Sequence, residues 1–219
     1  MTDIALFNMV EQQIRPWNVH SQVLLKAITR LDRSLFVPDE QQALCFFDTA
    51  IELDGRSRML EPRVVARLIQ ALDIQPDDQV LVVGAGSGYS AALCARLAST
   101  VVCQDTNQSA LDRAAKNCAA AGIDNIVFQK VASSNSSSDN VEYDAILVRE
   151  GIPASPQDHL KKLSVSGRCV ALIGHDCVME MICYTRDGKD INEESLIEIL
   201  KLSNDPFGDS ARVKQSFVF

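Results

Sequence analysis

Three glycines and one aspartate have the residue types and the spacing of a site for a nucleoside-bearing cofactor. Gly84, Gly86 and Gly88 follow the apolar run 80–83, and Asp105 ends a second apolar stretch. Glycines let a ligand approach the backbone, a helix N-terminus presents free N–H groups, and an acid after the next strand accepts hydrogen bonds from ribose hydroxyls. The residues predicted to bind the cofactor are Gly84, Ala85, Gly86, Ser87, Gly88, Tyr89 and Asp105.

The glycine spacing indicates which cofactor to expect. A dinucleotide turn reads G-x-G-x-x-G and would place its third glycine at position 89, where this chain has Tyr89. G-x-G-x-G is typical of enzymes that use S-adenosyl-L-methionine, which has no pyrophosphate to cradle. We therefore expect S-adenosyl-L-methionine, with a nicotinamide cofactor or a turn that merely closes a strand onto a helix as alternatives. The Tyr89 ring either packs in the core or stacks on adenine.

The elements that must position these residues alternate between strand and helix. Apolar runs predict strands over 80–83, 126–131, 143–148 and 168–173, with another at 101–105. Helical spacing follows the glycine turn and recurs over 107–121, where Gly122 is expected to end the helix. This alternation predicts an α/β fold with a Rossmann-like, doubly wound and mostly parallel sheet.

The segments on either side are expected to complete one domain over residues 1–219. Residues 1–62 are predicted to form an N-terminal helical layer, residues 63–175 the cofactor-binding core and residues 176–219 antiparallel edge strands near 178–184, 195–202 and 213–219. Asp3 is expected to cap a helix whose inner side carries Ile4, Phe7, Val10 and Ile14, and Ser21 to cap a second helix. A short strand is expected over 48–53, a helix from Pro62 and a surface loop over 133–140.

Composition narrows the class of protein. The chain has 219 residues, a net charge of −8 and a pI near 4.9, which argues against a nucleic-acid partner. The sequence shows no signal peptide and no apolar run of about 20 residues, so no membrane partner is expected. The seven cysteines form no C-x-x-C pair, which favours buried thiols in a reducing cytoplasm over a metal site.

Several further motifs resemble the protein-L-isoaspartate O-methyltransferase family. They cover most of the chain and comprise residues 9–19, Phe36-Val37-Pro38, Asp48 with 51–53, Pro62 with 64–66, 144–148, Ile152-Pro153, Leu163 and Gly167-Arg168. The resemblance implies methyl transfer from S-adenosyl-L-methionine to the free carboxylate of isoaspartyl residues in damaged proteins or peptides, as a step in protein repair.

The sequence also departs from the family pattern. In the acceptor loop, the family serine aligns with Leu60 and its threonine with Arg58, so Ser57 is the nearest hydroxyl. Ser57 and Arg58 are therefore the candidate catalytic residues. Two acids that the family places around the cofactor align with Val82 and Ala132. These departures leave a second hypothesis open, namely a non-catalytic member that acts as a binding or regulatory module.

Overall fold

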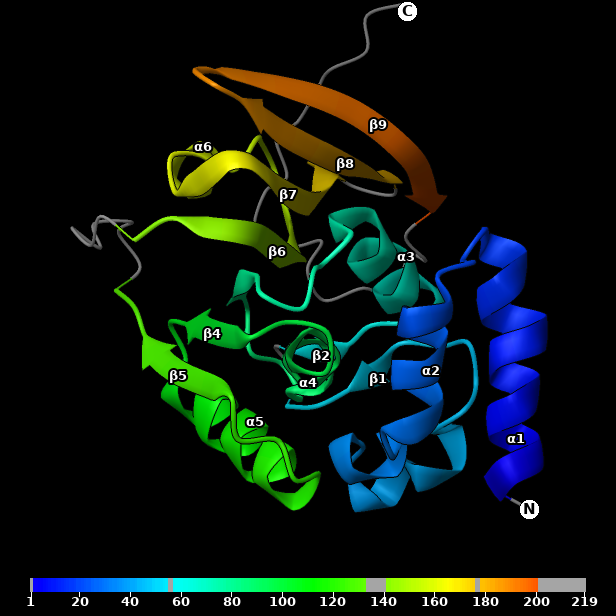
Figure 1. Cartoon of the computed structure of the whole chain (residues 1–219). Coiled ribbons are helices and arrows are strands. Elements are labelled where there is room, and N and C mark those ends of the chain that lie inside the picture. The colour runs from blue at the N-terminus through cyan, green and yellow to red at the C-terminus, as the bar shows by residue number, and fades with distance from the viewer. Residues whose placement is uncertain (1, 55–56, 133–140, 176–177, 201–219) are drawn as a thin grey trace, which may run out of the picture.

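The computed structural model describes residues 2–54, 57–132, 141–175 and 178–200. Its main sheet has seven strands, with helices packed beside it (Figure 1). The strand order is β5-β4-β3-β6-β7-β8-β9. The strands span Gln79–Val83 (β3), Thr100–Asp105 (β4), Ile126–Lys130 (β5), Tyr143–Ile152 (β6), Leu163–His175 (β7), Val178–Asp187 (β8) and Asp190–Leu200 (β9).

The sheet is parallel from β5 to β7 and antiparallel from β7 to β9, which confirms the predicted mostly parallel sheet with an antiparallel edge. β6 and β7 are longer than predicted, and β9 begins at Asp190 rather than near 195. The predictions for 133–140 and 213–219 lie outside the described residues. The chain runs from β3 outward to β5 and then crosses to β6, so the topological switch point lies between β3 and β6.

The strands alternate between two faces, as period-two geometry requires. Val80 and Val82 face a large core that also contains residues of α3 (Pro62–Leu72), α4 (Tyr89–Ala95) and α5 (Gln108–Ala120). Leu81 faces a smaller core on the opposite side, which contains Leu160 of α6 (Gln157–Leu160). Among the described residues, the second face is therefore covered much less than the first.

The N-terminal layer is helical, as predicted. Its helices, however, do not all have the α-helical winding that the sequence pattern suggested. α1 (Thr2–Asn8) continues into a π-helical segment η1 (Met9–Ile14) and a 3₁₀ turn η2 (Arg15–Trp17). Ile4 and Phe7 are exposed, and the buried positions are Met9, Val10 and Ile14. The prediction of an inward stripe through Ile4 and Phe7 was wrong because π-helical winding changes the phase of the buried face.

The other predicted helix starts are largely confirmed. α1 begins at Thr2, so Asp3 lies in its first turn and is not its cap. The Ser21 hydroxyl caps α2 (Gln22–Arg30) by accepting a hydrogen bond from the Leu24 N–H at 3.4 Å, and Pro62 opens α3. Two 3₁₀ segments follow α2, η3 (Arg33–Phe36) and η4 (Asp39–Leu44).

A small hairpin lies between the N-terminal layer and the sheet core. Its strands are β1 (Ile51–Glu52) and β2 (Arg58–Met59), which pair antiparallel. The strand predicted over 48–53 therefore exists but is shorter than expected. The hairpin carries the predicted catalytic residues and brings them toward the glycine turn.

Candidate active site

The glycine turn joins β3 to α4 and has the backbone conformation that its sequence predicts. Gly84, Gly86 and Gly88 have φ angles of 92°, 54° and 88°, a region that disfavours residues with a Cβ. At Gly88 a Cβ would lie 2.9 Å from the Ala114 carbonyl oxygen, so this glycine also permits the close approach of α5.

α5 holds three successive carbonyl groups of the turn. The carbonyl oxygen of Gly86 accepts a hydrogen bond from Arg113 Nε at 3.1 Å, and that of Ser87 accepts one from Asn117 Nδ2 at 3.0 Å. The Cys118 thiol is 3.6 Å from the Gly88 carbonyl oxygen. These α5 side chains fix the orientation of the carbonyl groups of the turn. The sequence pattern of α5 did not predict this role.

Asp105 lies at the carboxyl end of β4, as predicted, and its carboxylate is fixed in place. Oδ2 accepts a hydrogen bond from the Ala85 N–H at 2.7 Å, and Oδ1 accepts one from the Asn107 N–H at 2.8 Å. A carboxylate offers about four lone-pair sites, so each oxygen can still accept a further bond. The group is half-buried and stands beside the turn, where ribose hydroxyls would need an acceptor.

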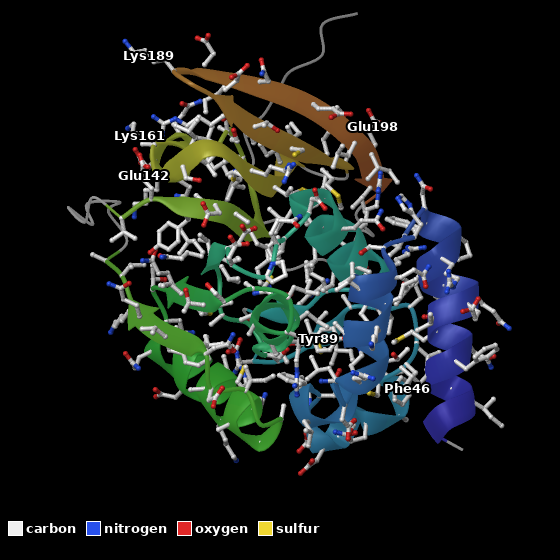
Figure 2. All side chains as sticks on the ribbon, viewed as in Figure 1. Phe46, Tyr89, Glu142, Lys161, Lys189 and Glu198 are labelled. Atoms are coloured by element: carbon white, nitrogen blue, oxygen red, sulfur yellow. The ribbon has the colours of Figure 1, made fainter. Side chains whose placement is uncertain are left out.

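The Tyr89 ring packs in the protein interior (Figure 2). It meets Phe36 edge-to-face, with ring centroids 5.4 Å apart, and the Arg33 guanidinium lies 4.6 Å from its centre. Burial raises the pKa of its hydroxyl. Of the two alternatives for this ring, the structure shows packing and not a surface for adenine.

The hairpin is tied to the glycine turn through α5. Arg113 donates to Gly86 and also pairs with Asp54, with 3.0 Å between Nη1 and Oδ2. Asp54 in turn accepts a hydrogen bond from the Ser57 N–H at 2.9 Å. The Ser57 hydroxyl is buried, and no hydrogen-bond partner exists for it within the described part of the chain. A buried hydroxyl without a protein partner is suited to a ligand.

Arg149 also lies beside the glycine turn, although no sequence motif pointed to it. It is buried, with 4% of its surface exposed, and a Cβ on Gly86 would lie 2.6 Å from its Nη1. Its Nη2 also donates to the carbonyl oxygen of Arg58 on β2. The signal that could have found it is an arginine directly after the buried run 145–148, at the end of a strand next to β3.

The sequence around the acceptor loop holds four arginines, at positions 56, 58, 63 and 67, and those that the structure describes do not form one cluster. Arg58 lies on β2 beside Arg149, whereas Arg63 pairs with Asp48 at 2.9 Å and stacks 4.2 Å above the Trp17 ring. Arg56 lies outside the described residues. Arg63 therefore makes its contacts with residues of the N-terminal layer. The guanidinium groups of Arg113 and Arg149, in contrast, contact the glycine turn.

The three positions that depart from the family pattern have different surroundings. Val82 is fully buried among core residues, so no acidic group supports the cofactor from there. Leu60 is partly buried against the same core, and its carbonyl oxygen accepts a hydrogen bond from Arg33 at 3.3 Å. Ala132 is exposed at the end of the described segment after β5.

Thiol groups near the turn are poor nucleophiles. Burial raises the pKa of Cys103 and of Cys118 to about 12, although the charge of Arg149 opposes the rise at Cys103. All six described cysteines are buried and unbridged. Among the described residues no group of side chains could hold a metal ion, and no helix is both long and apolar enough to cross a bilayer.

Comparison with known proteins identifies the family. Residues 6–200 match the model of the family described as protein-L-isoaspartate(D-aspartate) O-methyltransferase. A protein-L-isoaspartate O-methyltransferase 1 of Rhodopseudomonas palustris is 32% identical over 193 residues, which cover 87% of this chain and 79% of the relative. The chain belongs to this family. A protein-L-isoaspartate O-methyltransferase of Methanoculleus marisnigri is 33% identical, over 83% of each protein.

Solved structures of the protein-L-isoaspartate O-methyltransferase family have the same fold. One protein-L-isoaspartate O-methyltransferase superposes with a TM-score of 0.75 at 19% identity, covering 95% of this chain and 67% of that one. A putative Plasmodium falciparum member, in complex with S-adenosyl-L-homocysteine, gives a TM-score of 0.72 at 17% identity, over 93% and 98% of the two chains. These matches confirm the predicted fold class. None of the comparisons supports the non-catalytic alternative.

The residues around the turn fit a nucleoside cofactor at its ribose end. The anchored Asp105 carboxylate retains acceptor sites, and the buried Ser57 hydroxyl lies in the hairpin that α5 ties to the turn. On the side of the turn that faces β6, the charged group in contact with the turn is the Arg149 guanidinium and not an acid. The family's acidic group at position 82 is thus replaced by a buried valine, and a cation stands nearby.

Proposed function

We propose that this protein is an S-adenosyl-L-methionine-dependent protein carboxyl methyltransferase of the L-isoaspartyl repair type. The observation that carries the proposal is the positive-φ glycine turn with the anchored Asp105 beside it, in a chain of this family. The methyl acceptor is the free carboxylate of an isoaspartyl residue in a damaged protein or peptide. A substrate of this kind is in keeping with a cytoplasmic protein. The net charge of −8 is in keeping with one that does not bind nucleic acid.

The reaction needs little acid–base chemistry. When bound, S-adenosyl-L-methionine supplies an electrophilic methyl group on a sulfonium. A carboxylate acceptor is already ionised at neutral pH, because its pKa lies near 4. Its oxygen forms the new bond to carbon while the carbon–sulfur bond breaks toward sulfur, which leaves a neutral ester and a neutral thioether. The protein must therefore hold the acceptor oxygen in line and exclude water.

We propose that few side chains of this protein bind the cofactor and position the acceptor. We propose that the backbone of residues 84–89 and the Asp105 carboxylate hold the nucleoside. Ser57 is suited to positioning the acceptor, since its hydroxyl is buried and lacks a partner in the described structure. Arg58, on the adjacent strand β2, supplies positive charge near the same place. Neither residue needs to act as a base.

Calorimetric titration of S-adenosyl-L-homocysteine into the wild type and Asp105→Asn tests the cofactor half of the proposal. The wild type should bind at micromolar concentration. We expect the variant to bind about 10- to 100-fold more weakly, because a hydrogen bond to a charged group contributes roughly 1.5–3 kcal/mol.

Asp187→Asn, at the end of β8 and far from β3 and β4 in the sheet, is the matched control and should bind like the wild type. Absence of binding by the wild type at millimolar ligand, or equal binding by all three proteins, would contradict the assignment of this site. NADH serves as the ligand that distinguishes a dinucleotide site, and it should not bind.

A further inference from the structure

We infer that Arg149 is a carboxylate-binding residue of this site. The inference rests on the proposed function and goes beyond it, since it assigns a specific ligand group to a residue outside the glycine motif. Three observations carry it: the distorted strand end that aims the side chain, the contact of the guanidinium with the glycine turn, and its second contact with the acceptor hairpin.

The end of β6 is irregular at the point where Arg149 lies. Val148 is opposite Ala171 of β7, but the next paired position, Ile152, is opposite Ile173. β6 thus uses two more residues than β7 over the same distance, and Arg149 opens this bulge. Bulges next to active sites re-aim side chains. Period-two alternation places Arg149 on the same face as Leu147, which is the face covered by α3, α4 and α5.

The bulge lies at the carboxyl end of the sheet beside the topological switch point, where open α/β sheets bind their ligands. Val148, the residue before Arg149, is opposite Val83, the residue before Gly84. The guanidinium therefore reaches the turn from the neighbouring strand. Because a Cβ at Gly86 would lie 2.6 to 2.9 Å from both terminal nitrogens and the central carbon, the guanidinium lies directly over this glycine.

Arg149 also contacts the hairpin that carries the acceptor-loop residues. It donates a hydrogen bond to the carbonyl oxygen of Arg58 and so bridges β6, the glycine turn and β2. Arg113 bridges the turn and the hairpin from α5, through the Gly86 carbonyl oxygen and the Asp54 carboxylate. Arg149 is thus a second guanidinium at the junction of the cofactor turn and the acceptor hairpin.

A carboxylate is the ligand that this arrangement favours. A guanidinium presents five N–H donors in a planar fork that matches the two oxygens of a carboxylate, and burial strengthens such a pair. Each of the two proposed reactants carries a carboxylate. One belongs to the amino-acid end of the cofactor, and the other belongs to the isoaspartyl acceptor. Both offer the same chemistry, so the experiment must separate the two sources.

The test uses Arg149→Met, which keeps much of the volume without the charge, and Arg149→Lys, which keeps the charge without the fork. Arg186→Met is the matched control, because Arg186 likewise donates to a backbone carbonyl, that of Leu163, at the far side of β7. Each protein is titrated with S-adenosyl-L-homocysteine and with 5′-methylthioadenosine, which lacks the amino-acid carboxylate. Each is then assayed for kcat and KM with an isoaspartyl peptide, and urea unfolding verifies that it is folded.

If Arg149 binds the cofactor carboxylate, Arg149→Met should bind S-adenosyl-L-homocysteine about 10- to 100-fold more weakly, with unchanged affinity for 5′-methylthioadenosine. If it binds the acceptor, both affinities should stay unchanged and the peptide KM should rise about tenfold or more. Arg149→Lys should fall between wild type and Arg149→Met in whichever quantity changes. Arg186→Met should match the wild type throughout.

Unchanged values in Arg149→Met for both ligands and for the peptide KM would overturn the inference. Tighter binding of S-adenosyl-L-homocysteine by Arg149→Met would also overturn it, because the guanidinium would then obstruct the site. Failure of the wild type to bind S-adenosyl-L-homocysteine is a separate result. It would contradict the proposed function itself, and the inference with it.

Discussion

At the scale of single residues, Arg33 links the N-terminal layer to the active-site elements. Its side chain is 1% exposed. Nε donates to the Cys45 carbonyl oxygen at 2.8 Å, Nη2 donates to that of Leu60 at 3.3 Å, and the guanidinium covers the Tyr89 ring. One buried cation thus holds η3, the end of the acceptor loop and the first residue of α4 together.

Arg33→Met should therefore lower the free energy of unfolding by about 2 kcal/mol. The substitution leaves two buried carbonyl groups without donors and removes the cation–π contact, and removal of a buried charge offsets only part of that loss. Urea unfolding measures the change. Arg15→Met, which breaks an exposed pair with Glu11, is the control and should change stability by less than about 0.5 kcal/mol. Equal stability of Arg33→Met and the wild type would refute this account of Arg33.

The sequence predicted the positions of the glycine turn and of Asp105, but it did not indicate the long side chains that contact the turn. Gly84, Gly86, Gly88 and Asp105 lie where their spacing indicated, because a turn between a strand and a helix is a local structure. Arg149 comes from a strand far along the chain, and its direction depends on a bulge that no local pattern announces.

At the scale of elements, the β1–β2 hairpin is the part that brings Ser57 and Arg58 toward the glycine turn. The Arg113–Asp54 pair holds it to α5. In a double-mutant cycle with Asp54→Ala and Arg113→Ala we expect a coupling energy of about 0.5–1 kcal/mol, since both side chains are about a quarter exposed and solvent screens the pair.

Hydrogen exchange provides the matching local measurement. The Leu53 N–H donates to the Ser57 carbonyl oxygen at 2.9 Å across the hairpin, and its exchange should accelerate in both single variants. The Val82 amide in β3 is the internal control and should not change. A coupling energy near zero together with unchanged exchange at Leu53 would show that the pair does not hold the hairpin.

Strands and helices were predicted more accurately than the N-terminal winding. Apolar runs bounded by turn residues predicted the bounds of β3, β4 and β5 closely, and they located β6, β7 and β8, which are longer than expected. The π-helical segment Met9–Ile14 breaks the 3.6-residue period, so the expected inward positions Ile4 and Phe7 are exposed. The length of β6 was underestimated because the polar pair Arg149-Glu150 interrupts its apolar run.

At the scale of the whole molecule, sheet order explains why one site gathers residues from distant segments. The turn after β3, the end of β4 and the end of β6 all lie at the carboxyl edge of the parallel strands, beside the switch point. The hairpin of the N-terminal layer meets them there (Figure 1). The alternation of strands and helices predicted this sheet, whereas the docking of the hairpin depends on side-chain contacts that a single sequence does not reveal.

The most direct test of the proposed isoaspartyl methylation is a competition between an isoaspartyl peptide and the peptide of the same sequence with a normal aspartyl residue. The purified protein is incubated with both peptides and S-adenosyl-L-methionine, and mass spectrometry follows methyl-ester formation on each. We predict that the isoaspartyl peptide alone gains a methyl group and that omission of S-adenosyl-L-methionine abolishes the product. No ester on either peptide, from a protein that binds S-adenosyl-L-homocysteine, would contradict the proposed substrate.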